Sequence, residues 1–432
     1  MVVVFALVAL AVVGVLVTAN WYVWRRLFRD TTRGPGTARR VGAVVIAGGW
    51  ALAVGALVAE RTGAPFWLQR VLAWPGFLWL ALSVYLLLAV LAGEVVRPLL
   101  RRFLDRRAAA RPAGPGELRA PAADPERIPA GTAPPRTPPA GPEPSACSGA
   151  TPASPLAVPS RRLFVSRVVA GAAAAAAVGT VGYGTYGVLR GPRVKRVTVP
   201  LAKLPRVAHG FRIAVVSDIH LGPVLGRGFA QTVVDTINST QPDLVAVVGD
   251  LVDGSVKDLG PAAAPLAQLR ARYGAYFVTG NHEYFSGAEQ WVAEVRRLGL
   301  IPLENARTEL PHFGLAGVND VAGEDEGQGP DYARALGDRD RARACVLLAH
   351  QPVQIHDAVD HGVDLQLSGH THGGQLWPGN LVAGAANPTL AGLERYGDTQ
   401  LYVSRGAGAW GPPTRVGAPS DITVIELASR QA

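Results

Sequence analysis

Five short clusters of Asp, His and Asn lie in the second half of this 432-residue sequence, and each follows an apolar run. Their side-chain oxygens and nitrogens are the atoms that bind divalent transition metals. One cluster alone would be a weak signal, because Asp also caps helices and Gly also serves turns. Five in succession, with five of the nine histidines, predict a metal centre. The clusters are Asp218-Ile219-His220, Gly249-Asp250-Leu251-Val252-Asp253, Gly280-Asn281-His282-Glu283, His350-Gln351-Pro352 and Gly369-His370-Thr371-His372-Gly373-Gly374.

The spacing within these clusters predicts how their side chains meet. Asp218 and His220 are two positions apart, so alternation at a strand end should place both on one side, where they can bind one cation. His370 and His372 have the same spacing and the same expected geometry. Asp250 has two carboxylate oxygens and could bridge two ions. Mixed oxygen and nitrogen ligands favour Mn, Fe or Zn over Mg or Ca.

The elements that must position these residues are short strands whose ends meet. From Val197 onward, apolar runs alternate with segments of helical periodicity, which predicts an α/β domain. Ligand sites in open α/β sheets form at the carboxyl ends of strands, where these clusters lie. We expect helices over 228–238 and 288–298, and strands over 212–216, 243–248, 275–278, 344–348, 364–367, 400–403 and 422–425.

The order and spelling of the five clusters resemble the calcineurin-like metallophosphoesterase superfamily over most of residues 211–427. Three further segments are similar to the membrane-attached bacterial branch of that superfamily: Gly317-Val318-Asn319-Asp320, Val403-Ser404-Arg405-Gly406 and Gly411-Pro412-Pro413. The resemblance implies a two-sheet α/β sandwich with metal-binding strand-end loops. Here that domain is preceded by an all-α transmembrane region, and residues before 93 take no part in the resemblance.

Carried over by matching position, the resemblance implies two divalent or mixed-valence transition-metal ions. One ion would be held by Asp218, His220, Asp250 and His372. The other would be held by Asp250, Asn281, His350 and His370, so that Asp250 bridges the two. His282 would stand near the substrate phosphate as proton donor or charge stabiliser, and Asp253 would orient its ring.

The expected reaction is hydrolysis of a phosphomonoester or phosphodiester by a metal-bound hydroxide, followed by proton transfer to the departing oxygen. The substrate is expected to be lipid-linked or envelope-derived, or a soluble extracellular phosphodiester. An alternative is a metal-dependent sensor or binding module for a phosphorylated envelope ligand. The sequence leaves the choice between ester classes, the identity of the metals and the oligomeric state open.

The N-terminal part of the sequence predicts membrane spans. Uncharged apolar runs cover 2–19, 41–59, 74–93 and 168–189, each close to the ~20 residues that a helix needs to cross a bilayer. We therefore divide the chain into three transmembrane helices (1–104), a Pro/Ala/Gly-rich disordered linker (105–160), a fourth transmembrane helix or twin-arginine-like leader (161–195) and a metallophosphoesterase domain (196–432).

The distribution of charge predicts the orientation of these spans. Residues 1–189 hold 20 basic and 8 acidic residues, a net charge of +12, whereas residues 190–432 hold 22 and 25, a net charge of −3. The Arg residues lie beside the spans, which favours orientation in a membrane over nucleic-acid binding. The positive-inside rule puts the N-terminus and the catalytic domain outside a bacterial cell membrane. The two cysteines, Cys147 and Cys345, exclude a disulfide framework.

Overall fold

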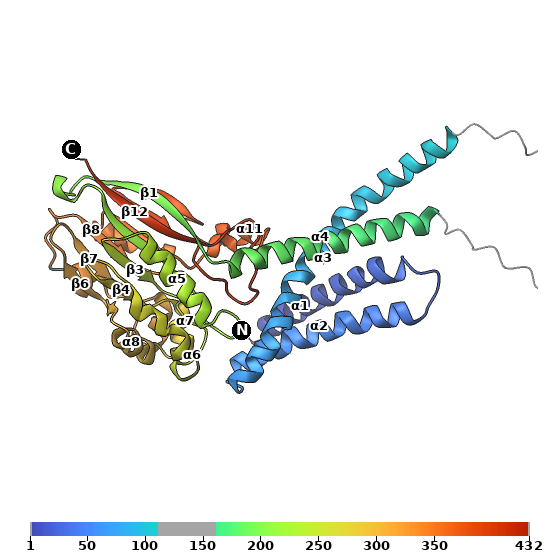
Figure 1. Cartoon of the computed structure of the whole chain (residues 1–432), viewed down its shortest axis with the longest axis horizontal. Helices are drawn as coiled ribbons and strands as arrows, with labels where there is room; N and C mark the ends of the chain where they lie inside the picture. Colours follow the sequence, from blue (N-terminus) through green and yellow to red (C-terminus); the bar gives the residue numbers. More distant parts are fainter. Residues whose placement is uncertain (1, 111–160, 431–432) are drawn as a thin grey trace, which may run out of the picture.

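The computed structural model describes residues 2–110 and 161–430 (Figure 1). Long helices lie to one side of a two-sheet α/β domain, as Figure 1 shows. Most of the predicted linker, residues 111–160 with Cys147, lies outside the described residues. The predicted two-sheet α/β architecture behind a helical N-terminal region is confirmed.

The N-terminal helices cover all four predicted spans. They are α1 (Val2–Trp24), α2 (Thr37–Arg61), α3 (Phe66–Ala109) and α4 (Arg161–Leu189), with a π-helical turn over Arg25–Arg29. Within the described residues, three helical segments are long and apolar enough to cross a membrane: Thr37–Arg61, Phe66–Arg107 and Arg161–Leu189. The third helix continues to Ala109, past the expected boundary at 104, because no helix-breaking residue follows Pro98 until after Arg111.

The Arg-rich ends of these helices meet. Arg26 donates to Glu94 of α3 at 2.7 Å, and Arg97 donates to the same carboxylate at 3.1 Å. Arg167 of α4 donates to the backbone oxygen of Thr31, in the connection between α1 and α2, at 3.0 Å. The segments that the charge pattern places on the cytoplasmic side therefore lie together.

The first sheet carries three of the five clusters. Its strand order is β1 (Arg193–Leu201), β12 (Asp421–Ser429), β2 (Phe211–Val216), β3 (Leu244–Val248), β4 (Ala275–Val278) and β5 (Ile301–Pro302). Strands β2 to β5 are parallel, so their carboxyl ends share one edge. Helices α5 (Arg227–Ser239), α6 (Val256–Ala263) and α8 (Ala288–Arg297) pack their buried apolar faces on this sheet.

The second sheet carries the other two clusters. Its order is β10 (Gly392–Tyr396), β11 (Thr399–Val403), β9 (Leu365–Ser368), β8 (Cys345–Leu348), β7 (Gly314–Gly317) and β6 (Ala306–Glu309). The four inner strands are parallel and the two edge strands antiparallel. Helices α9 (Tyr332–Leu336) and α10 (Ile355–Asp360) cover its outer face.

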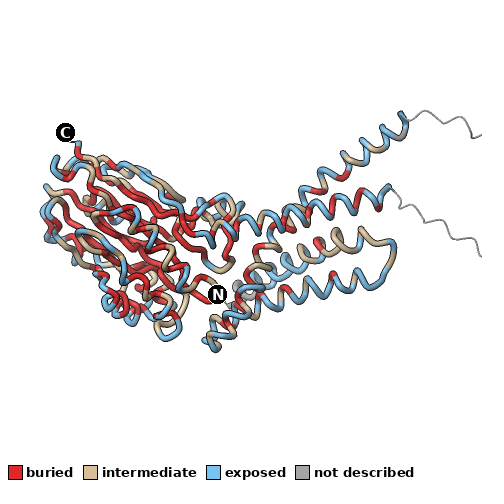
Figure 2. The backbone as a smooth tube through the Cα atoms, viewed as in Figure 1, coloured by how far each residue is buried: buried red, intermediate tan, exposed pale blue. Residues whose placement is uncertain are grey.

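The main core lies between the two sheets, where the tube in Figure 2 is mostly buried. Ile213 and Val215 of β2 share one buried cluster with Leu315 of β7 and Leu365 of β9. Their neighbours on the opposite faces are also apolar, because helices cover both outer faces. Continuous apolar runs therefore mark these inner strands, and the site can form where the runs end.

All seven strands predicted from the sequence are present, with ends shifted by a few residues. Five more, β1, β5, β6, β7 and β10, had no predicted counterpart. Several of them are short or mix polar and apolar residues, so they give no clear period-two pattern. Strand β1 begins at Arg193, before the expected domain boundary at 196.

Candidate metal centre

The five clusters lie in loops at the carboxyl ends of five strands. Asp218 and His220 follow β2, and Asp250 and Asp253 follow β3. Helix α7 (Asn281–Ser286) begins directly after the turn that follows β4. The last two loops follow β8 and β9 of the second sheet and contribute His350, His370 and His372. The centre is thus built across both sheets, from residues that span more than 150 positions of the sequence.

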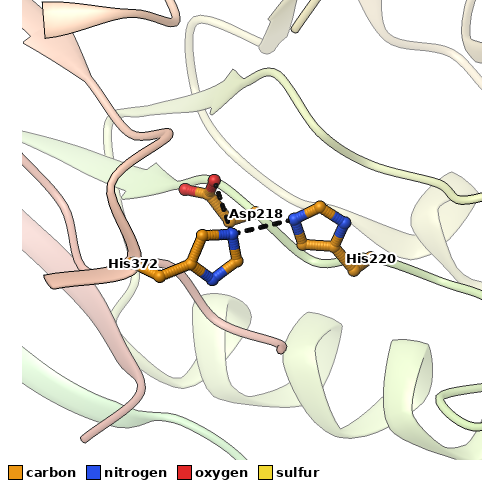
Figure 3. A group of neighbouring side chains, drawn as sticks. All are labelled: Asp218, His220 and His372. Carbon is orange, nitrogen blue, oxygen red and sulfur yellow. Dashed lines mark hydrogen bonds and ion pairs between the residues drawn. The ribbon is translucent and has the colours of Figure 1, made fainter. Parts of the chain in front are cut away.

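One group of potential ligands consists of Asp218, His220 and His372, drawn in Figure 3. The Nε2 atoms of His220 and His372 are 3.0 Å apart, and the latter atom is 3.4 Å from Oδ1 of Asp218. All three residues are buried, with at most 8% of their surface exposed. The two imidazoles and the carboxylate converge on one point, as the ligands of a single cation would.

A second group consists of Asp250, His350 and His370. Nε2 of His350 is 3.1 Å from Oδ2 of Asp250. Nδ1 of His370 lies 3.0 Å from the amide oxygen of Asn281, so this neutral side chain joins the same group. The structure therefore gathers three residue types here, as expected of a second cation site.

Asp250 lies between the two groups. Its Oδ2 is 3.1 Å from Nε2 of His350 and 3.8 Å from Nε2 of His220, which belong to different groups. Burial acts to raise the pKa of this carboxyl, but the charges that His350 and His220 carry when protonated outweigh it and hold the pKa well below the usual range. A carboxylate that favours its ionised form, placed between two groups of potential ligands, would suit a position shared by two cations.

His350 shows that these residues fit a metal ion. Its Nδ1 lies 2.8 Å from the carbonyl oxygen of Val248, which can only accept a hydrogen bond, so Nδ1 carries the proton. In the neutral ring the lone pair on Nε2 points into the second group, where Oδ2 of Asp250 lies 3.1 Å away. This nitrogen is buried and makes no hydrogen bond. Since a buried polar atom without a partner is costly, a cation is the natural partner.

Two further side chains border the first group without belonging to the ligand set predicted from the sequence. Oδ1 of Asp253 is 2.8 Å from Nδ1 of His220 and 2.7 Å from Nδ1 of His282. Burial acts to lower the pKa of His282, but the hydrogen bond to Asp253 and the charge of Asp250 raise it to about 9. Burial opposes the ionisation of Asp253, and the two histidines lower its pKa to about 2. His282 is therefore protonated at neutral pH and can donate a proton.

The backbone at five of the predicted ligands adopts a conformation that residues with a side chain rarely adopt. Asp218, His220, Asp250, His370 and His372 all have φ between 48° and 72°. Such left-handed positions are uncommon for residues other than glycine, and strained backbone of this kind concentrates at functional sites. Among the described residues, three other non-glycine residues have a positive φ: Gln241, Asn305 and Gln375.

This backbone geometry corrects the predicted mechanism of convergence. Strand alternation does not place Asp218 beside His220, because β2 has already ended at Val216. Left-handed turns bring the two together instead. His370 and His372 do not repeat the arrangement, since they belong to different groups. The side chains lie close together in the structure, but through a local geometry other than the one expected.

Two buried positioning residues had no predicted role. Glu283 accepts hydrogen bonds from the backbone N–H groups of Asp250, Leu251 and Gly280 at 2.6–2.9 Å, which ties the β3 and β4 loops together. Its place at the end of the Gly280-Asn281-His282-Glu283 cluster was the available signal. Arg415 donates to the backbone oxygen of His372 at 3.1 Å, and its guanidinium lies 3.0 Å from Nδ1 of the same ring. No spacing pattern in the sequence links Arg415 to that ring.

A two-sheet α/β fold with Asp, His and Asn side chains in its strand-end loops defines a class of metal-dependent phosphoesterases. Residues 211–374 match the family model described as calcineurin-like phosphoesterase. The chain is 36% identical over 273 residues to an uncharacterized metallophosphoesterase of Helicobacter pylori strain J99, covering 62% of this chain and 73% of that protein. The chain therefore belongs to the calcineurin-like metallophosphoesterase family.

Other relatives differ in how much of their length is matched. A Danio rerio protein named transmembrane protein with metallophosphoesterase domain is 39% identical over 259 residues, which cover 57% of this chain and 59% of that protein. The uncharacterized metallophosphoesterase YkuE of Bacillus subtilis is 30% identical over 280 residues, which cover 62% of this chain and 98% of that protein. The match to the Danio protein thus spans only about three-fifths of its length.

Proposed function

We propose that this chain is a membrane-tethered hydrolase of phosphomonoesters or phosphodiesters, with two divalent or mixed-valence transition-metal ions in the strand-end loops. Asp218, His220 and His372 would hold one ion, and Asn281, His350 and His370 the other, with Asp250 shared. The observation that carries the proposal is the position of Asp250 between two ligand groups, within 3.1 and 3.8 Å of a ring nitrogen from each.

When bound, the ions supply an activated water and positive charge for the phosphoryl oxygens. The protein's own part in the reaction rests on His282. Asp253 holds this ring through Nδ1, so Nε2 is left for the substrate. A protonated imidazole can donate to the departing ester oxygen, a contribution of about 10²–10⁴-fold. Asp253 thereby orients a metal ligand and the proton donor with one carboxylate oxygen.

The proposed location is the extracytoplasmic face of a bacterial membrane. The domain contacts α2 and α4 near the ends that the charge pattern puts outside, for example where Thr185 of α4 meets Thr414 at 2.6 Å, and it contacts α3 both at Phe66 and further along the helix at Tyr85. The Arg-rich ends meet elsewhere in the bundle, around Arg26 and Glu94. A domain at one end of the bundle and Arg residues at the other support the predicted orientation.

The test is turnover by the purified full-length chain in detergent, with Mn²⁺, Fe²⁺ or Zn²⁺ supplied. The substrates are p-nitrophenyl phosphate, a monoester, and bis-p-nitrophenyl phosphate, a diester. We expect metal-dependent hydrolysis of at least one and loss of it in Asp250→Asn. A protein that binds the metals and these phosphate esters without turning either over would instead be a sensor or binding module.

A further inference from the structure

The metal centre lies against a hairpin of candidate membrane spans. Val224, in the loop after His220, packs against Ala56 of α2 and Phe77 of α3. Phe66, the first residue of α3, packs against the core of the first sheet. The loop that carries a predicted metal ligand therefore rests on the adjoining ends of two spans. This places the centre at the level of a membrane surface.

The end of α2 also supplies a charge to the rim of the centre. Glu60, next to the last residue of α2, interacts electrostatically with Asp253 and His282. No pattern in the sequence links these residues, which are more than 190 positions apart. A carboxylate near the end of α2 therefore contributes to the electrostatic environment of Asp253 and of the proposed proton donor.

An apolar segment follows the last predicted ligand directly. After His372 the chain leads into α11 (Gly379–Ala386), whose sequence Gly-Asn-Leu-Val-Ala-Gly-Ala-Ala contains no charge and no buried residue. Trp377, Leu381 and Val382 are 52%, 68% and 75% exposed. Exposing such a group of apolar side chains to water costs free energy, whereas contact with lipid is favourable.

The position of this segment shows what would cover it. The hydroxyl of Tyr85 donates to the backbone oxygen of Trp377 at 2.9 Å, and Leu376 packs on the cluster around the same tyrosine. Tyr85 lies inside the apolar run 74–93 of α3, so the segment lies beside a candidate span rather than above it. Lipid that surrounds α3 would therefore surround α11.

Two more exposed rings stand at the rim. The rings of Phe285 and Trp410 lie edge-on to His282, with centroids 5.6 and 5.7 Å away, and are 75% and 53% exposed. The Gln375 side chain joins the two parts of this surface, because it donates to the backbone oxygen of Trp410 and accepts from its N–H. The exposed apolar side chains of α11 and the two rings beside His282 are thus connected through one residue, Gln375.

From these contacts we infer that the substrate is a phosphate ester of a bilayer lipid, which reaches the metal centre while its acyl chains stay in the membrane beside α11. This inference rests on the proposed hydrolase function and names its substrate class. The reaction adds the oxygen of one water to phosphorus and breaks one P–O ester bond. The released alcohol takes a proton from His282. Trp377, Leu381 and Val382 form the lipid-facing surface.

The test uses the full-length chain, loaded with metal, in vesicles of phosphatidylethanolamine, phosphatidylglycerol and phosphatidate. Hydrolysis of each lipid is measured beside hydrolysis of glycerophosphoethanolamine and of bis-p-nitrophenyl phosphate, which are soluble. We expect at least one bilayer lipid to be hydrolysed faster than the soluble glycerophosphodiester. In Leu381→Asp and in the milder Leu381→Asn, the ratio of lipid to soluble rates should fall by about tenfold, since a polar group in lipid costs roughly 1.4 kcal/mol or more.

The matched control is Val207→Asp, which also adds a charge at an exposed valine (76% exposed). Val207 lies in a short 3-10 helix over Arg206–Ala208, beyond the end of β1 that is farther from α4, and should leave the ratio unchanged. Hydrolysis of soluble esters alone, or an unchanged ratio in the Leu381 variants, would overturn the inference and leave the hydrolase intact. Absence of hydrolysis of every ester by metal-loaded protein would instead refute the proposed function.

Discussion

At the scale of single residues, one carboxylate organises the proton chemistry. Asp253 accepts from the ring of His220, a predicted ligand, and from the ring of His282, the proposed donor, at 2.8 and 2.7 Å. Because Asp253 holds both rings through Nδ1, the Nε2 atoms of both rings point away from Asp253. The two rings are therefore fixed relative to each other, which would pre-organise the site for the proposed reaction.

We predict that His282→Asn lowers kcat by about 10²–10⁴-fold and leaves the metal content unchanged. Because the folded pKa is raised to about 9, the wild-type ring is protonated at neutral pH and loses its proton as the pH rises through that value. Activity should fall above pH ~9 in the wild type, and the variant should lack this limb. The measurement is a pH–rate profile with metal analysis of each sample.

The control for this variant is His209→Asn, which alters an exposed histidine outside the metal centre. It should keep both the rate and the alkaline limb. If His282→Asn keeps nearly full kcat, or loses metal to the same extent as activity, the ring is not the proton donor and the assignment fails.

At the scale of elements, close packing of the turns sets the position of the ligands. Gly280, between β4 and α7, lies against Asp250, and a Cβ there would meet the backbone nitrogen and the Oδ1 atom of that residue. The β3 and β4 loops approach each other closely because this glycine has no side chain. Glu283 then ties them through three backbone N–H groups.

We therefore predict that Gly280→Ala displaces Asp250 and costs about 1–3 kcal/mol, the usual penalty for overpacking a tight site. Metal content and turnover should both fall by about tenfold or more. Gly228→Ala in α5 is the matched control, because a Cβ there meets nothing within 4 Å. A Gly280→Ala protein with wild-type metal content would show that the turns are not closely constrained.

The sequence predicted the inner strands and the positions of the clusters, but it did not predict the edge strands or the tertiary contacts around the site. Apolar runs identified the inner strands, because those strands are buried on both faces. Edge strands such as β6 and β10 are partly exposed and mixed in composition, so they had no such signal. The ligand clusters were visible as residue types after strands. Their left-handed backbone, the support from Arg415 and the approach of Glu60 depend on tertiary contacts that local patterns do not encode.

At the scale of the whole molecule, the membrane helices pack against the phosphoesterase domain. The spans contact the domain through Val224, Thr414 and the Trp377 backbone, all in loops on the side of the metal centre. A simple tether would need only the connection from α4 into β1. The further contacts come from α2 and α3, which therefore pack against loops of the metal centre.

We predict that protease sites inserted at two exposed turns will differ in accessibility in intact cells. A site at Asp398, between β10 and β11, should be cleaved from outside. A site at Gly34, between α1 and α2, should be protected until the membrane is broken. Immunoblotting of tagged full-length protein provides the measurement. Cleavage at Gly34 with protection at Asp398 would reverse the orientation.

The account depends most on two cations held around Asp250. The direct measurement is the metal content of full-length protein, purified after supply of Mn, Fe and Zn and analysed by mass spectrometry with the protein concentration measured independently. We predict about two ions per chain for the wild type and a marked loss for Asp250→Asn, with His209→Asn unchanged. A folded wild-type protein that binds no transition metal, or an Asp250→Asn variant that retains both ions, would contradict the account.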